Sequence, residues 1–445
     1  MIFWFIQNHS LALGYDHGAY SHFVNLLSQG QKIDQLPVYL QHQFEPFSGT
    51  FFYVLTEFIG KDVFFSWWYL AIYIGTSCAL FLLGKKNKKY TLGSYLWLFL
   101  FLFSVLQYTN FWWSFGKQMF ATFFLILLMR YHRNIIITML LSAACIWLHR
   151  LTGFVAILFL IFSLISLWKK RNIKVIFLTL FGILLGIASY KSTFSYQVMP
   201  FLRAMTQHFY DSVWIEGKYG TGFSGGTFWF YQTPLLLMTL LWGVTYGLHE
   251  NIGNIIKKPH VLLCIIIGLM VVFRCIAHTR LWSFLDLFLI ILIVKTFYNT
   301  IQKKWIYIFM AIQIALWWFF AYKWHTPFID KKEHQIIRNI TKNIPESVTL
   351  VTLSAEYMSW MTGYMDNEIY SLSQWISSNI WSGTDKDTMK FDKILLCKKL
   401  STLPGDIFIY VGAKEKFTST QNNECLSEVK KWDNNARLLR YVWER

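Results

Sequence analysis

Cationic side chains at the ends of long apolar runs are the first residues of this chain that could do chemistry. Arg and Lys bind phosphate oxygens, and Arg can do so through two parallel N–H donors. A group of such cations suits a substrate that carries a phosphate. The alternative is that these side chains only snorkel to a surface and form local ion pairs. The group consists of Lys117, His149, Arg150, Arg274, His278 and Arg280.

Asp16 is the candidate for acid–base chemistry. It lies in the sequence Gly-Tyr-Asp-His-Gly-Ala-Tyr over 14–20, just before a predicted helix. A carboxylate there can act as the general base that removes a proton from an acceptor hydroxyl. His17 and Glu45, which also lie within residues 1–63, are further candidates for the site. The alternative for Asp16 is a helix N-cap, a position that Asp fills well, and the sequence leaves both interpretations open.

Motifs for several other chemistries are missing from the sequence. There is no Walker motif and no HExxH, which argues against ATP-driven transport and against zinc hydrolysis. The pair of acidic residues in Asp385-Lys386-Asp387 is better interpreted as a helix start than as a metal site. The six cysteines have no metal-type spacing. No motif requires a divalent metal, and we predict no metal site and no certain cofactor.

The composition indicates a membrane protein. Hydrophobic residues make up 55% of the chain and charged residues 15%, which is too apolar for an ordinary soluble protein. The net charge of +17 gathers in short loops between apolar runs, so it indicates membrane topology and not nucleic-acid binding. Lys and Arg are enriched in cytoplasmic loops. The basic loops, which we therefore expect on the cytoplasmic side, are 85–89, 130–133, 169–174, 257–258 and 303–304.

The apolar runs predict membrane-spanning helices. A helix needs about 20 apolar residues to cross a bilayer, and most of the runs approach that length. We therefore expect an α-helical polytopic protein of the cell inner (plasma) membrane with about 10 transmembrane helices. The runs are 64–84, 91–109, 115–130, 134–149, 151–168, 175–190, 229–248, 261–277, 281–300 and 305–322.

Three regions follow from this topology. Residues 1–63 form an outer segment with two interfacial amphipathic helices, at 17–29 and 46–60, and the topology favours a further transmembrane helix upstream of it. Residues 64–322 form the helix bundle. Residues 323–445 form an extracytoplasmic α/β domain. Its expected helices are 330–343, 355–362 and 386–399, and its expected strands are 347–354, 368–372, 406–411 and 437–443.

Four segments resemble those of a known enzyme class. They are Gly-Tyr-Asp at 14–16 with Tyr20 and Glu45-Pro46; Trp-Leu-His-Arg-Leu-Thr-Gly at 147–153; His-Thr-Arg-Leu-Trp-Ser-Phe-Leu-Asp at 278–286; and the tail segments 343–348 and 356–363. Together they resemble the GT-C class of membrane glycosyltransferases. Enzymes of this class take a sugar from a polyprenyl-phosphate lipid on the outer leaflet of the membrane.

The resemblance implies roles for several residues. Asp16 would be the catalytic base, and Arg280, His149 and Lys117, with the neighbouring Arg150, would bind the donor phosphate. The partners would be a membrane lipid donor and a glycan, lipid or protein acceptor. Two alternatives stay open: a polymerase of O-antigen or exopolysaccharide that uses lipid-pyrophosphate donors, which the segments 115–121 and 148–149 also resemble, and a lipid or solute transporter.

Two residue pairs complete the sequence-based expectations. Arg274 and Asp286 lie near the expected outer ends of neighbouring helices, where a structural ion pair is favoured over a ligand role. Cys397 and Cys425 are the only cysteines after residue 275. They either form a disulfide in the outer domain or remain two unrelated thiols.

The two interpretations of Asp16 predict different effects of Asp16→Asn. A general base cannot be replaced by a neutral amide, so sugar transfer should be nearly abolished while folding and donor binding persist. Asn caps helices as well as Asp does, so a capping role predicts near-normal activity. Transfer assays on the folded variant distinguish the two.

Overall fold

The structure is a computed structural model that is mostly helical and includes one mixed β-sheet. It divides into two compact units. The helical unit comprises residues 37–54 and 67–325, and the mixed unit comprises residues 1–36, 55–66 and 326–445. The residues described are 17–32, 35, 45–83, 92–112, 116–132, 134–168, 173–191, 198–199, 235–237, 239, 258–273, 278–294, 303–323, 329–345, 347–353, 355–365, 367, 369–372, 397–398, 400–413, 415 and 425–442.

The described part of the helical unit consists almost entirely of helices. Two helices, α4 and α5, cross the boundary between the units. The helices are α4 (Pro46–Ile59), α5 (Lys61–Leu83), α6 (Leu92–Leu102), α7 (Val105–Trp112), α8 (Gly116–Tyr131), α9 (Ile135–Leu148), α10 (Arg150–Trp168), α11 (Ile173–Ala188), α15 (Pro259–Val272), α16 (His278–Leu292) and α17 (Lys303–Lys323).

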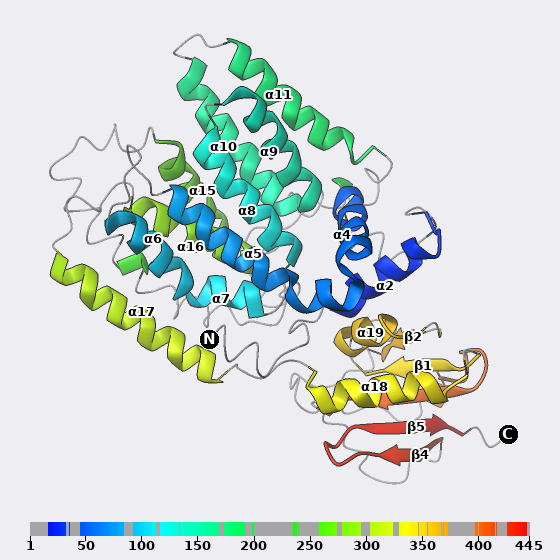
Figure 1. Ribbon diagram of the computed structural model, residues 1–445. Helices are drawn as coiled ribbons and strands as arrows, with labels where there is room; N and C mark the ends of the chain where they lie inside the picture. The colour runs from blue at the N-terminus through cyan, green and yellow to red at the C-terminus, as the bar shows by residue number, and fades with distance from the viewer. Residues whose placement is uncertain are drawn as a thin grey trace. The chain divides into compact units, whose positions relative to one another are not determined.

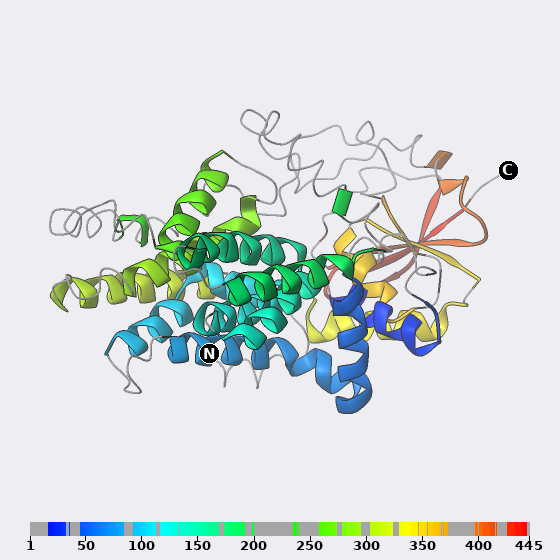
Figure 2. The same cartoon turned by 90° about the horizontal axis from the view of Figure 1, so that it is seen from above.

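Helices α8, α9, α10 and α11 pack side by side in this unit (Figures 1 and 2). Two glycines of α11 allow the closest approach. A Cβ atom at Gly182 would lie 2.7 Å from the Met139 carbonyl oxygen of α9, and one at Gly186 would lie 2.8 Å from the Ile146 side chain. Both positions therefore require glycine for α9 and α11 to pack at this distance.

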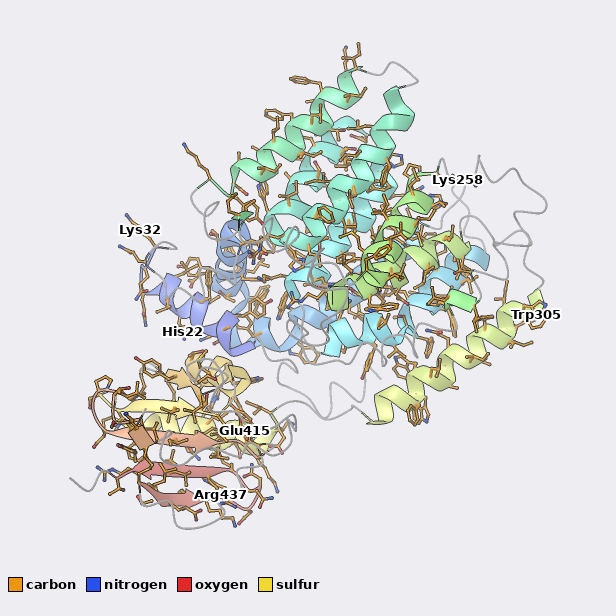
Figure 3. All side chains as sticks on the ribbon, turned by 180° about the vertical axis from the view of Figure 1, so that it is seen from behind. His22, Lys32, Lys258, Trp305, Glu415 and Arg437 are labelled. Atoms are coloured by element: carbon orange, nitrogen blue, oxygen red, sulfur yellow. A yellow bond between two sulfur atoms is a disulfide. The ribbon has the colours of Figure 1, made fainter. Side chains whose placement is uncertain are left out.

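The outer faces of several helices carry large apolar side chains. On α11, Phe177 is 67% exposed and Leu184 is 63% exposed. On α17, Trp318 is 67% exposed, and Trp305 lies near the N-terminal end of that helix (Figure 3). Apolar patches of this kind mark surfaces that bind other molecules.

The predicted fold class is wrong in its central feature. Over the residues that the structure describes, no helix is both long enough and apolar enough to cross a membrane. The expectation of a polytopic membrane protein with about 10 transmembrane helices is therefore not supported. The same finding overturns the predicted inner-membrane location and the extracytoplasmic placement of the C-terminal domain.

Helix length explains much of this error. The apolar run 91–109 is divided by a turn at Phe103–Ser104 into α6, of 11 residues, and α7, of 8 residues. Helices α9 and α15 have 14 residues each, which is about 21 Å at 1.5 Å per residue, against a hydrocarbon core of about 30 Å. The predicted run 229–248 lies almost entirely outside the described residues.

The mixed unit contains a five-stranded sheet with the order β2-β1-β3-β5-β4. Strands β1, β2 and β3 are parallel, whereas β5 is antiparallel to both β3 and β4. Its elements are α2 (His17–Ser28), α18 (Lys331–Asn343), β1 (Thr349–Thr352), α19 (Ala355–Thr362), β2 (Ile369–Ser371), β3 (Ile407–Val411), β4 (Leu426–Lys431) and β5 (Arg437–Tyr441).

Both faces of the sheet are covered by apolar side chains. Leu350 and Tyr410 belong to a core that includes residues of α18 and α19. Their neighbours Val351 and Ile409 belong to a second core on the opposite face. This alternation follows from the two-residue period of a strand, and because both faces are covered, β1 and β3 are almost continuously buried.

Helix α2 packs on α19 within the mixed unit. A Cβ atom at Gly363 would lie 2.8 Å from the backbone of Gly18, so glycine is required where the segments meet. The Ser21 hydroxyl donates a hydrogen bond to the Gly363 carbonyl oxygen at 3.2 Å. The predicted helix over 17–29 is thus present, but Tyr20 and Phe23 are buried in protein and do not lie on a membrane interface.

Most of the elements expected in the C-terminal region are present, with ends that differ by a few residues. The expected helix 386–399 is not tested, because the structure describes only its residues 397–398. One strand, β4, was not expected. Strand β4 was missed because its residues after Leu426 are exposed and follow no clear apolar alternation. Its register also shifts between Glu428 and Lys430, which is the mark of a bulge.

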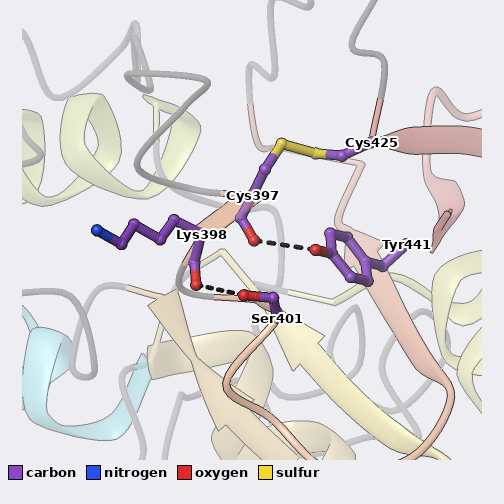
Figure 4. Close-up of a disulfide and its surroundings, with 5 residues drawn as sticks. All are labelled: Cys397, Lys398, Ser401, Cys425 and Tyr441. Carbon is purple, nitrogen blue, oxygen red and sulfur yellow. Dashed lines mark hydrogen bonds between the residues drawn. A yellow bond between two sulfur atoms is a disulfide. The ribbon is translucent and has the colours of Figure 1, made fainter. Parts of the chain in front are cut away.

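Cys397 and Cys425 form a disulfide, which confirms the bridged alternative (Figure 4). Their Cα atoms are 6.1 Å apart, within the range that a disulfide spans. The Tyr441 hydroxyl donates to the Cys397 carbonyl oxygen at 3.1 Å, and the Val442 N–H donates to the Cys425 carbonyl oxygen at 2.8 Å. The disulfide thus ties Cys397 to the start of β4, and the two hydrogen bonds tie both cysteines to the end of β5.

Removal of this disulfide should destabilise the mixed unit. The bridge spans a sequence separation of 28 residues, and loss of such a constraint on the unfolded chain costs roughly 3 to 4 kcal/mol. Denaturant unfolding of Cys397→Ser/Cys425→Ser should show this loss. The control Cys78→Ser changes an exposed free cysteine and should leave the free energy of unfolding unchanged. Equal stability of the double variant and the native chain would show that the bridge contributes nothing.

Candidate functional site

Glu45 is the centre of a buried charged cluster in the helical unit. Its side chain is 1% exposed and accepts a hydrogen bond from Lys117 Nζ at 2.9 Å. Its other carboxylate oxygen accepts from Arg150 Nε at 3.3 Å. Lys117 lies in the first turn of α8 and Arg150 is the first residue of α10, so one carboxylate joins two helices that are distant in sequence.

The N-terminus of α10 also contributes to this cluster. The backbone N–H of Arg150 donates to Glu45 Oε1 at 3.3 Å. The first N–H groups of a helix have no partner within the helix, and the helix dipole places partial positive charge there. Glu45 therefore lies where a negative charge is favoured for two reasons, the backbone dipole and the two cationic side chains.

His149 ends α9 and caps the N-terminus of α10. Its backbone is extended, its carbonyl oxygen accepts from the Gly153 N–H at 2.8 Å, and its Nδ1 accepts from the Thr152 N–H at 3.3 Å. The Thr152 hydroxyl lies 3.0 Å from the same nitrogen. Because Nδ1 accepts these hydrogen bonds, the proton of the neutral ring is assigned to Nε2.

The packing of α5 against α8 fixes the position of Lys117. A Cβ atom at Gly116 would collide with the Trp68 ring, so this residue must be glycine. The Trp68 ring in turn meets the Phe52 ring edge-to-face, with centroids 4.8 Å apart. These rigid aromatic contacts hold the first turn of α8 beside α4, the helix that follows Glu45.

The cations keep Glu45 ionised despite its burial. Burial by itself raises the pKa of Glu45. The positive charges of Lys117 and Arg150 and, to a lesser degree, His149 have a larger opposite effect, so that the pKa is lowered to about 2. Because this pKa is below that of the unfolded chain, the ionised carboxylate stabilises the fold above about pH 4.5. That contribution is lost as the pH falls toward 2.

The same surroundings keep His149 neutral. Burial lowers the pKa of His149, Glu45 opposes that shift, and the charges of Arg280, Lys117 and Arg150 lower the pKa further, to about 3. Arg280, near the start of α16, thus acts electrostatically on the same imidazole as Lys117 and Arg150. The structure therefore brings four of the predicted donor-phosphate residues to one place.

A second buried polar network joins α16 to α7, to α8 and to the turn that precedes α7. Asp286 Oδ2 accepts from the hydroxyl of Ser104 at 2.7 Å and from Gln107 Nε2 at 3.0 Å. Gln107 Nε2 also donates to the Ser283 carbonyl oxygen at 2.7 Å, and Gln118 Nε2 donates to the Ser283 hydroxyl at 2.7 Å. Sequence reasoning had considered Asp286 only as a partner of Arg274.

Other predicted site residues cannot be placed. Asp16 and Arg274 lie outside the described residues, so neither the catalytic role of Asp16 nor the expected Arg274–Asp286 pair is tested. His17 and His278 begin α2 and α16, but their side chains are not described. Over the residues described, no group of three or more His, Cys, Asp or Glu side chains could hold a metal ion.

Sequence reasoning missed two features: the role of Glu45 at the centre of the charged cluster, and the polar network around Asp286. It treated Glu45 as a minor candidate because its partners lie 72 and 105 positions away. A usable signal for the network existed: Gln107, Gln118, Ser283 and Asp286 interrupt otherwise apolar sequence. Polar side chains in such surroundings need partners, and they pair with one another here.

No protein-family model and no curated protein matches this chain. The resemblance to GT-C enzymes therefore remains a prediction from the quoted segments. Chemically, Lys117, Arg150 and the N-terminus of α10 already bind one oxyanion, the Glu45 carboxylate, and the charge of Arg280 adds to the positive charge of the cluster.

His149→Asn should reduce the pH dependence of stability while keeping the cap of α10. A histidine with a folded pKa near 3 and an unfolded pKa near 6.5 binds its proton first in the unfolded chain, so folding stability falls below about pH 6.5. Between pH 7 and pH 5 this amounts to about 2 kcal/mol. Asn caps helices well but does not titrate.

The measurement is denaturant unfolding of the native chain and the variant at both pH values. The difference between the two proteins isolates His149 from the other histidines. An identical loss of stability in both proteins would show that His149 is not held neutral by the fold.

Proposed function

We propose that this protein is a glycosyltransferase that moves a sugar from a polyprenyl-phosphate donor to an acceptor hydroxyl. The observation that carries the proposal is the convergence of Lys117, Arg150 and the charge of Arg280 around Glu45 and His149. The Arg150 side chain is 27% exposed, whereas Glu45 is 1% exposed, so Arg150 reaches from the buried carboxylate toward solvent.

The chemistry requires cations at the leaving group. A base takes the proton of the acceptor hydroxyl, the acceptor oxygen forms a bond to the anomeric carbon, and the bond from that carbon to the phosphate oxygen breaks. The departing polyprenyl phosphate carries the negative charge, which Lys117, Arg150 and Arg280 would stabilise. Asp16 stays the candidate for the base on the strength of the resemblance.

Exposed apolar side chains on α11 suit a lipid-linked donor. The charges of Glu45 and Arg150 both act on the pKa of Tyr190, which lies two residues after the end of α11. This end of α11 therefore lies near the cluster. One to two turns before it, Leu184 is 63% exposed and Ile187 is 40% exposed. A polyprenyl chain along this face of α11 would bring its phosphate toward Arg150. Burial of each CH₂ group there contributes about 0.8 kcal/mol.

Binding of farnesyl phosphate, a short polyprenyl phosphate, tests the proposal. The native chain should bind it, and Arg150→Gln should weaken binding about 10- to 100-fold, since a hydrogen bond to a charged group contributes about 1.5 to 3 kcal/mol. Arg130→Gln is the matched control, because Arg130 is exposed in the last turn of α8. Farnesol, which has no phosphate, should bind more weakly than farnesyl phosphate and should be indifferent to Arg150→Gln.

Equal affinity for farnesyl phosphate and farnesol would contradict the proposal. A transfer assay with polyprenyl-phosphate and polyprenyl-pyrophosphate sugars then separates the two enzyme alternatives. A transferase of the proposed kind releases polyprenyl phosphate, whereas a polymerase releases polyprenyl pyrophosphate.

A further inference from the structure

Gln118 has a polar atom that the fold leaves unused. Its side chain is 2% exposed, and it lies next to Lys117 in the first turns of α8. Nε2 donates to the Ser283 hydroxyl oxygen at 2.7 Å. In the part of the chain that the structure describes, Gln118 Oε1 is buried and has no hydrogen-bond partner.

The orientation of the Gln118 amide follows from its neighbours. The Ser283 hydroxyl has one hydrogen, which it donates to the Arg280 carbonyl oxygen at 2.7 Å. The Ser283 oxygen must then accept from Gln118, and only the NH₂ group of the amide can donate. The opposite orientation would place two acceptors against each other. The carbonyl oxygen of Gln118 is therefore the atom that remains without a partner.

Leaving such an oxygen buried costs about 1 to 3 kcal/mol, and an apolar side chain of the same shape would avoid this cost. Buried polar atoms without partners are rare in folded proteins. The surrounding network is otherwise satisfied, since Gln107 donates both to Asp286 and to the Ser283 carbonyl oxygen. An acceptor left over from such a network is suited to a ligand that brings its own donor.

The position of Gln118 indicates what that ligand carries. Lys117 precedes it in the chain, and Ser283 connects its amide to the backbone of Arg280. Gln118 therefore lies beside the first turn of α16, which carries Arg280, and next to Lys117 in the chain, although the Lys117 side chain is directed to Glu45. A sugar linked to phosphate through its anomeric carbon is a ligand that presents an anionic phosphate and, beside it, neutral hydrogen-bond donors, and it is the ligand that the proposed function requires.

We propose that Gln118 Oε1 accepts a hydrogen bond from a hydroxyl group of the sugar that the donor phosphate carries. This proposal rests on the proposed function and assigns the part of the site that recognises the sugar. A site that hydrogen-bonds a substrate hydroxyl rejects an analogue without that hydroxyl, because the protein atom then stays buried and unpaired. Gln118 would thus determine which sugar is accepted.

The test compares ligands with and without the sugar. The probes are farnesyl phosphate, farnesyl-phosphate-linked glucose, mannose, galactose and arabinose, and the monodeoxy analogues of whichever sugar binds most tightly. The variants are Gln118→Leu and Gln313→Leu. Gln313 is the matched control, since it lies in α17, is 2% exposed and also has a buried Oε1 without a partner among the described residues.

The expected result is selective. Gln118→Leu should bind farnesyl phosphate like the native chain but bind the preferred sugar-linked probe about 10- to 100-fold more weakly. One monodeoxy analogue should show a similar loss with the native chain and no further loss with Gln118→Leu. Gln313→Leu should bind every probe like the native chain.

Two results would overturn the proposal, and they have different meanings. If Gln118→Leu keeps the native preference among the sugar-linked and deoxy probes while Arg150→Gln still weakens farnesyl phosphate, Gln118 does not contact the sugar but the proposed function stands. If farnesyl phosphate binds no better than farnesol to the native chain, both proposals fail. Thermal unfolding of each variant confirms that it is folded during these measurements.

Discussion

A single buried carboxylate determines how the candidate site is organised. Glu45 is ionised inside the helical unit because Lys117, Arg150 and the N-terminus of α10 surround it. An ionised carboxylate without these partners would cost several kcal/mol to bury. The reverse dependence also holds, because Glu45 compensates the burial of Lys117, whose side chain is 9% exposed. Neither group could occupy its position alone.

The break between α9 and α10 serves this arrangement. A continuous helix through residue 149 would have no free N–H groups at Arg150 to meet Glu45. His149 makes the break by adopting an extended backbone and capping α10 with its ring. Its low pKa follows from the same burial and the same cations, so the cap stays neutral. Local helix geometry and the electrostatics of the cluster thus depend on each other.

The sequence predicted local features much better than distant ones. The break at His149–Arg150, the helix start at Pro46 and the strand at β3 follow from local signals of apolar period and helix termini. Of the six predicted cations, Lys117, His149, Arg150 and Arg280 interact within one cluster, whereas Arg274 and the side chain of His278 lie outside the described structure. The exposed strand β4 gave no local signal because it buries little apolar surface.

The larger error came from treating apolar content as evidence for membrane crossing. A run of apolar residues shows that a segment is buried or covered, but it does not fix the length of the helix that forms. Ser104 illustrates this point, since it lies in the turn between α6 and α7 and donates to Asp286, 182 positions away. Such a contact depends on the whole fold and cannot be found from the period of one segment.

A double-mutant cycle on Glu45 and Lys117 tests the central claim most directly. Glu45→Gln and Lys117→Met should each lower the free energy of unfolding by about 3 kcal/mol, because each removes the shortest contact of the buried charge that remains. The double variant should lose clearly less than the sum of the two, with a coupling energy of at least about 1.5 kcal/mol. Losses that add to within about 0.5 kcal/mol would show that the two residues are independent, and that Glu45 does not organise the site.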